Sequence, residues 1–198
     1  MGRHRHPARP CDPALTRRER PWSTLREYLS HKRTALLARR EAPAAGPVPL
    51  HAHVTAEGRS GIRRIRIRDF QIISDSGPDF AGYDLGPTSP ELQAGVLGSC
   101  VTHIFLIKAA ELEVPIDALE VDVRAEYDPR AQQPGDGDIP VYPHNFTYEV
   151  LIDSPASDEE LANLQAEVER VCPILNLIRN PQPVRGTVVR TRTGAPLV

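Results

Sequence analysis

The sequence has little lysine, few aromatic residues and no excess of apolar residues. Lysine occurs only as Lys32 and Lys108 in 198 residues, and aromatic residues make up 5% of the chain. We therefore expect a core built mainly from Val, Ile, Leu and Ala. The hydrophobic fraction of 40% is sufficient for one compact domain with an extension.

The beginning of the chain lacks the features of a secretory signal. Residues 1–21 contain charged residues and four prolines where a signal peptide has its apolar segment, and they show little amphipathic pattern. We also find no apolar run of the about 18 residues that a membrane-spanning helix needs. The sequence therefore predicts a soluble, cytoplasmic protein with no membrane partner.

The net charge of −2 is unevenly distributed. Residues 1–40 contain eleven Lys or Arg and three Asp or Glu, whereas the remainder carries a net charge of −10. A basic arm can bind nucleic acid, but this arm lacks the aromatic side chains on which bases stack. We expect a solvated arm and no nucleic-acid partner. The predicted organisation is a disordered basic arm at 1–22, a helix and linker at 23–47, and a folded domain at 48–198.

The three cysteines differ in their surroundings. Cys11 lies in the basic arm and is interpreted as incidental, whereas Cys100 and Cys172 lie in predicted secondary structure. Permanent disulfides are not expected in a reducing compartment. Cys100 is in the middle of an apolar helix, where burial alone would raise its pKa unless a cation or donor is near. Cys172 precedes Pro173 at a helix break, a position that favours a thiolate at the start of the next helix.

The pattern of apolar residues and helix-start signals predicts a mixed order of helices and strands. Two pairs, Thr24 with Glu27 and Ser157 with Glu160, match the capping box. Ser89 is predicted as the N-cap of the longest helix, in which Gly95 and Gly98 suggest that another backbone approaches closely. The predicted helices are 23–41, 89–113, 157–171 and a short one from Pro173 to 177 or 178. The predicted strands are 48–57, 64–68, 70–74, 119–127, 146–152 and 184–191.

Four segments occur in an order that resembles the OsmC/Ohr family of organic hydroperoxide peroxidases. They are Ala56-Glu57-Gly58-Arg59-Ser60-Gly61, Pro87-Thr88-Ser89-Pro90-Glu91-Leu92, Gly98-Ser99-Cys100 and Val171-Cys172-Pro173-Ile174. The resemblance covers about residues 50–192. It implies an α+β fold in which antiparallel sheets wrap around two central helices in an intertwined homodimer.

The resemblance also implies a site and a reaction. Cys100 corresponds to the cysteine that attacks an organic hydroperoxide, and Cys172 to the cysteine that resolves the sulfenic acid to a disulfide. Arg59 corresponds to the arginine that holds the thiolate, and Glu91 to the glutamate that holds this arginine. Glu91 precedes Cys100 by nine residues, where the peroxidase branch of the family has ten. On an unbroken helix nine residues are two and a half turns, which points the two side chains apart.

No cofactor is expected, and an external dithiol of the lipoyl type would reset the pair. Apolar neighbours of Cys100 favour an alkyl or lipid hydroperoxide. Three alternatives remain open: another thiol activity on the same pair, a non-catalytic redox sensor or hydrophobic ligand carrier, and nucleic-acid binding through residues 1–40. His103 lies one helical turn after Cys100 and fits a base or proton relay, although a core or interface histidine is the favoured interpretation. The remaining histidines form no convincing metal set.

Overall fold

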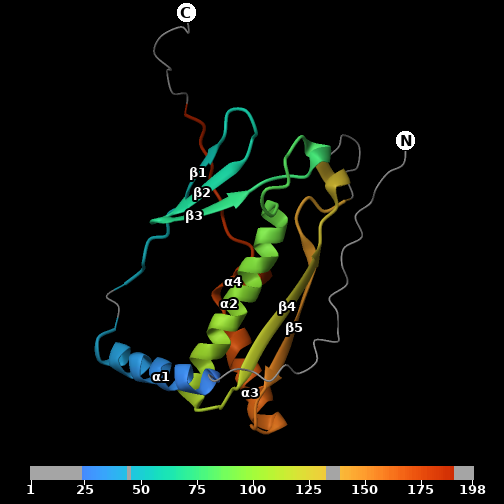
Figure 1. Ribbon diagram of the computed structural model, residues 1–198. Coiled ribbons are helices and arrows are strands. Elements are labelled where there is room, and N and C mark those ends of the chain that lie inside the picture. The colour runs from blue at the N-terminus through green and yellow to red at the C-terminus, as the bar shows by residue number, and fades with distance from the viewer. Residues whose placement is uncertain (1–23, 44–45, 133–138, 190–198) are drawn as a thin grey trace, which may run out of the picture.

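The computed structural model describes residues 24–43, 46–132 and 139–189. The predicted arm at 1–22, including Cys11, lies outside these residues. The chain is an α+β structure with two antiparallel sheets. The long helix α2 (Ser89–Leu112) runs through the middle, and the other helices and a long strand pair lie around it (Figure 1).

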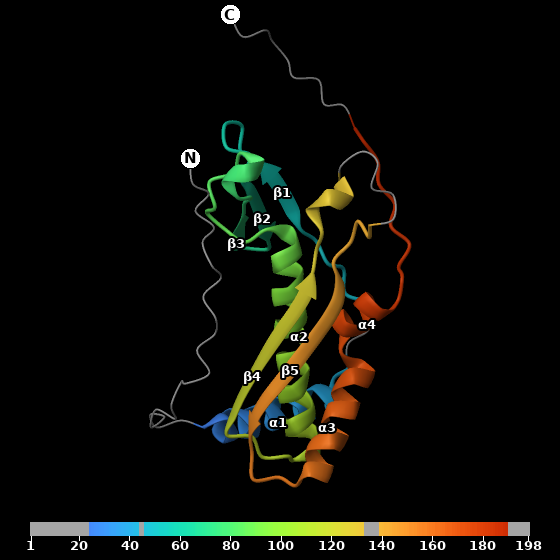
Figure 2. The same ribbon diagram turned by 90° about the vertical axis from the view of Figure 1, so that its right-hand side faces the viewer.

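The strands β4 (Ala118–Glu126) and β5 (His144–Asp153) form a two-stranded sheet that lies along α2 (Figure 2). Helix α3 (Asp158–Val171) then returns along α2 and is followed by the short helix α4 (Pro173–Arg179). Helix α1 (Leu25–Glu41) crosses α2 near the C-terminal end of α2. This helix packs against its own chain, where Leu29 is buried and Arg33 donates to the carbonyl of Ala110 at 3.0 Å.

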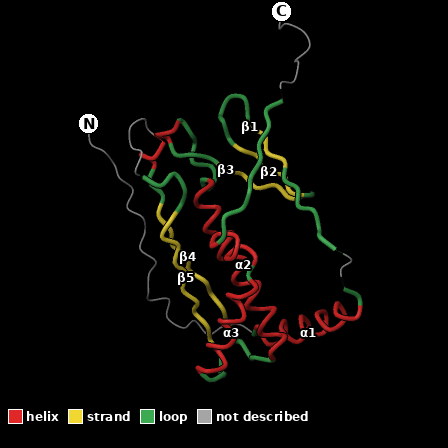
Figure 3. Tube along the Cα trace, turned by 180° about the vertical axis from the view of Figure 1, so that it is seen from behind, coloured by secondary structure: helices red, strands yellow, loops and turns green. Residues whose placement is uncertain are grey.

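The other sheet has three strands, β1 (His53–Ala56), β2 (Arg63–Ile67) and β3 (Phe70–Ser74), and lies beyond the N-terminal end of α2 (Figure 3). Val54, Ile65 and Ile72 are paired across the strands and therefore share one face. The strand predicted at 64–68 is thus confirmed as β2. Phe70 is 63% exposed and Ile72 is 42% exposed, so an apolar sheet face is uncovered in the single chain.

Two of the helix-start predictions need correction. The N-cap of α2 is Thr88 rather than Ser89, because the Thr88 hydroxyl accepts the N–H of Glu91 and Glu91 binds back in a capping box. Thr24 precedes α1 as predicted, but its side chain makes no capping hydrogen bond. The capping box of Ser157 and Glu160 is confirmed at the start of α3.

Two predicted strands are shorter or absent. The strand expected at 48–57 is reduced to β1, and residues 184–189 of the strand expected at 184–191 have no regular structure. These residues are fully exposed along the chain, with Val188 at 101%. An apolar, β-branched segment becomes a strand only when a neighbouring strand supplies its backbone hydrogen bonds.

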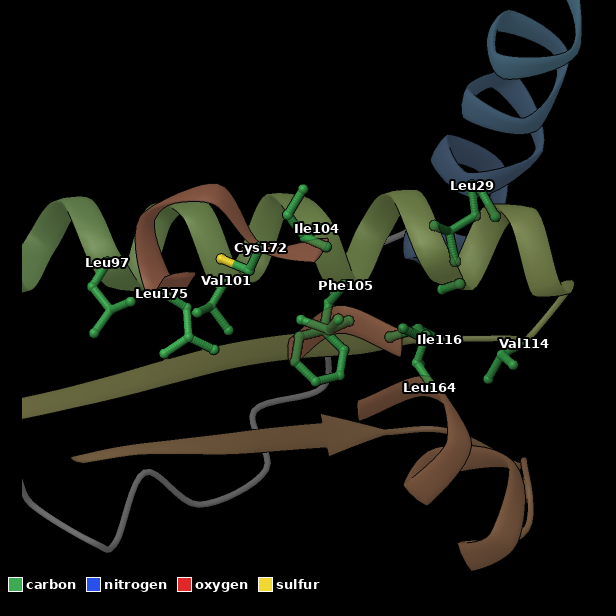
Figure 4. Close-up of a cluster of buried hydrophobic side chains, with 13 residues drawn as sticks. Leu29, Leu97, Val101, Ile104, Phe105, Val114, Ile116, Leu164, Cys172 and Leu175 are labelled. Atoms are coloured by element: carbon green, nitrogen blue, oxygen red, sulfur yellow. The ribbon is translucent and has the colours of Figure 1, made fainter. Parts of the chain in front are cut away.

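The core is a single cluster centred on α2 (Figure 4). It contains side chains from α1, α2, α3, α4 and the α2–β4 turn, among them Leu97, Val101, Phe105, Ile116, Leu164 and Cys172. Helix α2 is also long and apolar enough to cross a membrane by length and composition, with a mean hydropathy of 1.4. The expectation that no such run exists was therefore wrong. Helix α2 packs against β4, α1 and α3, as the core helix of a globular domain does.

Candidate functional site

Cys172 lies at the junction of α3 and α4. Its backbone N–H donates to the carbonyl of Val168 at 2.9 Å and ends α3, and Pro173 begins α4. Proline suits this place because the first helical position needs no N–H donor. The predicted helix break is confirmed. The Cys172 side chain is fully buried in the core, beside α2 (Figure 4).

The side chain of Asn176 fixes this junction. Its Nδ2 donates to the carbonyl of Glu169 at 3.1 Å and to the carbonyl of Cys172 at 2.9 Å. The Glu169 carbonyl belongs to the last turn of α3 and has no helical donor, because the residue four positions on is Pro173. The Cys172 carbonyl starts α4 and also accepts the backbone N–H of Asn176 at 3.0 Å. Asn176 therefore links the end of α3 to the first turn of α4 and holds the backbone of Cys172 on both sides.

A second set of contacts joins α3 and α4 to the sheet. The hydroxyl of Tyr148 on β5 donates to Glu169 Oε1 at 2.6 Å, and Arg179 on α4 binds Glu169 Oε2 at 2.9 Å. The Tyr148 bond, then Arg179, hold the pKa of Glu169 below its usual value. Burial and the adjacent Glu169 carboxylate raise the pKa of Tyr148, so its phenol stays protonated and keeps donating. The segment that carries Cys172 is thus fixed from three elements.

Cys100 and Cys172 are brought together. Cys100 lies on α2, and the sulfur of Cys172 lies 3.5 Å from its sulfur, with both thiols free. A disulfide requires about 2.05 Å between the sulfurs. The two residues are 72 positions apart in sequence, so only the packing of α4 on α2 creates this pair.

The surroundings of Cys100 keep its thiol protonated. Burial raises its pKa most, and the neighbouring Cys172 thiol raises it further. The backbone N–H of Ile174, in the first turn of α4, acts in the opposite direction by hydrogen bonding to the Cys100 sulfur. The N-terminal turn of α4 therefore supplies a backbone donor to Cys100.

Cys100 opens onto a small pocket of about 380 Å³. The lining comes from α2 and the start of α4 and consists of Leu92, Gly95, Val96, Ser99, Cys100, His103 and Ile174. Most of this surface is apolar, as expected for a site that accepts an alkyl group. A larger pocket of about 680 Å³ lies at the N-terminal end of α2, between Arg63, Gln93 and Tyr127, and neither cysteine lines it.

Arg59 does not lie in the Cys100 pocket. It is in the turn between β1 and β2, where the N–H of Gly61 donates to the carbonyl of Glu57 at 3.0 Å, and its side chain is exposed. In the described part of the chain, no hydrogen bond or ion pair connects Arg59 to Glu91 or to either cysteine. The turn itself is confirmed, whereas the contact between Arg59 and the thiolate stays a prediction.

Glu91 is occupied at the start of α2. Its Oε2 accepts the backbone N–H of Thr88 at 2.7 Å and the Thr88 hydroxyl at 2.8 Å. The side chain is exposed and is not part of the lining of the Cys100 pocket. Within one chain, Glu91 acts as a helix cap, and its predicted bond to Arg59 is not formed.

Sequence patterns gave no indication of Asn176, Tyr148 and Glu169. Their roles depend on contacts between α3, α4 and β5, which no local spacing reveals. His103 was noted for its spacing from Cys100 and interpreted as a core or interface histidine. The core interpretation is wrong, since its side chain is exposed and lines the pocket, and the interface interpretation stays a prediction. Among residues 24–43, 46–132 and 139–189, no group of three or more His, Cys, Asp or Glu side chains is arranged to hold a metal ion.

The family can now be assigned. The model of the OsmC-like protein family matches residues 82–186, which is more than half of the chain and includes both Cys100 and Cys172. The chain belongs to the OsmC-like family. The match excludes α1 and the three-stranded sheet, and therefore Arg59. No curated protein sequence matches the chain.

Solved structures agree with the fold. An OsmC-like protein from Mycoplasma pneumoniae is 18% identical, with a TM-score of 0.58 over 68% of this chain and 89% of its own. A putative osmotic stress induced and detoxification response protein from Psychrobacter arcticus is 18% identical, with a TM-score of 0.53 over 67% of this chain and 90% of its own. At these identities the similarity shows the OsmC-like fold alone.

Proposed function

We propose that this protein is a two-cysteine thiol peroxidase that reduces organic hydroperoxides. The observation that carries the proposal is the 3.5 Å approach of the two free sulfurs, one buried and one facing an apolar pocket. Cys100 attacks the terminal oxygen of the hydroperoxide and becomes a sulfenic acid, and the alcohol leaves. Cys172 then condenses with the sulfenic acid, which releases water and forms the disulfide. Family membership supports this chemistry.

A dithiol completes the cycle in this proposal. A thiolate of the dithiol attacks the disulfide, and its second thiol releases the protein in the reduced form. The reductant we propose is a small dithiol of the lipoyl type. A cytoplasmic location would keep such a pair reduced between turnovers.

We also propose a homodimer as the active form, for three reasons in the single chain. The sheet face that contains Ile72 and Phe70 is apolar and uncovered. A Cβ built on Gly95 of α2 meets no atom within 4 Å, so this helix face is open to a second helix. Finally, the raised pKa of Cys100 calls for a cation, and the three-stranded sheet of a second copy would bring Arg59 to it.

The proposal is tested by intact mass and free-thiol count after one equivalent of cumene hydroperoxide, in a Cys11→Ser background. We expect the loss of two thiols and of about 2 Da, as one disulfide requires. In the additional variant Cys172→Ser, a sulfenic acid at Cys100 should be trapped. If Cys100 is oxidised no faster than free cysteine, the peroxidase assignment is wrong.

A redox sensor and a peroxidase differ in turnover. With dihydrolipoamide and excess hydroperoxide, a peroxidase consumes many equivalents for each protein chain, whereas a sensor is oxidised once and then recycles slowly. The apolar pocket favours a ligand carrier as the second candidate. A carrier would bind an apolar probe in this pocket equally well after Cys100→Ser and Cys172→Ser, and would not oxidise.

A further inference from the structure

His103 shares the pocket with Cys100. It lies on α2 three residues after Cys100, and residues with this spacing are neighbours on a helix surface. Cys100 and His103 are the two side chains in the pocket lining that gain or lose a proton near neutral pH. The hydroxyl of Ser99 also lines the pocket, but it is far too weak a base to accept a proton from a thiol.

The electrostatic surroundings leave both partners neutral at rest. Burial keeps the Cys100 thiol protonated. Partial burial of the imidazole and the positive charge of Lys32 on α1 lower the pKa of His103, so its ring is neutral and able to accept a proton. Lys32 faces His103 from α1, and Cys100 faces it from its own helix.

From the shared pocket and the spacing on α2, we propose that His103 is the proton relay of the reaction at Cys100. It accepts the thiol proton as the sulfur attacks, and it donates this proton to the alkoxide that departs. This inference rests on the proposed peroxidase function and adds a residue to its mechanism.

The step is balanced without a further reactant. The sulfur lone pair bonds to the terminal oxygen of the hydroperoxide, which keeps its hydrogen, and the O–O bond breaks toward the alkyl oxygen. The sulfur is oxidised to sulfenic acid, and the peroxide is reduced to the alcohol. The proton passes from Cys100 to His103 and then to the alkyl oxygen, so a thiol and a hydroperoxide give a sulfenic acid and an alcohol. An alkoxide is a poor leaving group, and a positioned acid removes this obstacle.

The test compares two leaving groups on the same cysteine. Cumene hydroperoxide releases an alkoxide, which needs a proton, whereas iodoacetamide releases iodide, which needs none. The variants are His103→Asn and His103→Gln in the full chain, each with Cys11→Ser and Cys172→Ser so that Cys100 is the one reacting thiol. Second-order rate constants are measured by mass spectrometry, with iodoacetamide used at a pH above the titration of Cys100.

We expect both variants to lose about 10- to 100-fold in the oxidation rate at neutral pH, the range of general acid–base catalysis. Alkylation of the fully ionised thiol should stay within about twofold, because the site is intact and iodide needs no acid. An equal fall with both reagents would assign a structural role to His103 and overturn the relay. An unchanged oxidation rate in the variants would also overturn the relay. If the protein with His103 is oxidised rapidly in that case, the peroxidase assignment remains valid. If the protein with His103 is itself oxidised no faster than free cysteine, both the relay and the peroxidase assignment are overturned.

Discussion

Glu91 and Thr88 bind each other at the start of α2, where the Glu91 carboxylate accepts both the backbone N–H and the hydroxyl of Thr88. This relationship commits Glu91 to capping within one chain. The family resemblance instead assigns Glu91 to holding Arg59, and a carboxylate has enough acceptor sites to do both in a dimer.

The first prediction separates these two roles. Thr88→Ala removes the capping hydroxyl but keeps Glu91, and it should cost about 1 kcal/mol of unfolding free energy. Glu91→Gln should cost a similar amount. If Glu91 also holds Arg59, then Glu91→Gln alone slows oxidation of Cys100 by cumene hydroperoxide. Urea unfolding and the oxidation rate measure the two effects. Equal oxidation rates in both variants would show that Glu91 acts as a helix cap and does not hold Arg59.

The second prediction concerns Asn176, which holds both carbonyls around the α3–α4 junction. Asn176→Ala should lower the unfolding free energy by about 1 to 3 kcal/mol, because the part-buried Glu169 carbonyl loses its side-chain donor. The Cys172 carbonyl keeps the backbone N–H of residue 176. The substitution should also slow disulfide closure more than sulfenic acid formation, so that more Cys100 is oxidised to sulfinic acid by excess peroxide. Mass spectrometry distinguishes these products.

Asn180→Ala is the matched control for this experiment. Asn180 donates to the carbonyl of Asn176 at 2.7 Å at the end of α4, but it does not contact α3. The control should lose some stability and keep the ratio of disulfide to sulfinic acid. A similar ratio in both variants would mean that Asn176 does not position Cys172.

The third prediction is a pH dependence of stability at Glu169. Its pKa is lowered in the fold, so its contribution to stability is present above the unfolded pKa and is lost as the pH falls through the folded value. Tyr148→Phe removes the strongest cause of this shift. It should cost about 1 kcal/mol at neutral pH and nearly nothing in acid, where the carboxyl is protonated in both proteins. Urea unfolding across pH measures this difference.

Tyr142→Phe provides the comparison, because Tyr142 is 63% exposed and its ring lies at the surface. This control should unfold like the wild type at every pH. A cost for Tyr148→Phe that does not change between neutral and acidic pH would show that packing, and not the bond to Glu169, is responsible.

The fourth prediction tests the dimer at Gly95. A leucine at this position meets no atom of its own chain within 4 Å of the Cβ, and it improves helix propensity. In a monomer, Gly95→Leu should therefore be tolerated. If α2 packs on a second copy, the substitution should instead shift sedimentation from dimer to monomer. Sedimentation is the readout because Gly95 also lines the Cys100 pocket, where a leucine would affect oxidation in either state. Gly46→Leu, with open space in the segment between α1 and β1, is the control. A wild type that sediments as a monomer would refute the dimer directly.

The fifth prediction uses the two lysines. Lys32 lowers the pKa of His103, so Lys32→Gln should raise this pKa. As the pH is lowered, oxidation should then begin to slow at a higher pH, because the protonated imidazole cannot accept the thiol proton. Titration of the His103 ring by NMR measures the shift. Lys108→Gln is the control, since Lys108 pairs with Glu111 at 2.8 Å and is not among the groups that shift His103. Equal titration in wild type and Lys32→Gln would show that the α1 charge does not reach the site.

The sequence by itself determined the order of elements and the position of most of their boundaries. Local causes are sufficient for these features. Ser157 with Glu160 starts α3, and Pro173 forces a break after Cys172, because each acts through backbone groups a few residues away. The apolar sequence of α2 also predicted a buried helix, because a helix that is apolar on all sides is buried. Thr88 and Ser89 were exchanged as the cap because adjacent hydroxyls give the same local signal.

Only the tertiary structure decided which groups meet. The pairing of Cys100 with Cys172 and the opening of Cys100 and His103 onto one pocket depend on how α4 packs against α2. The hydrogen bonds of Asn176 depend on how α4 folds back on the end of α3. The same holds for residues 184–189, which had the composition of a strand but found no strand to pair with in the chain. Spacing along a chain specifies neighbours within a few residues. Contacts between distant segments are fixed by packing of the whole core, which no single segment encodes.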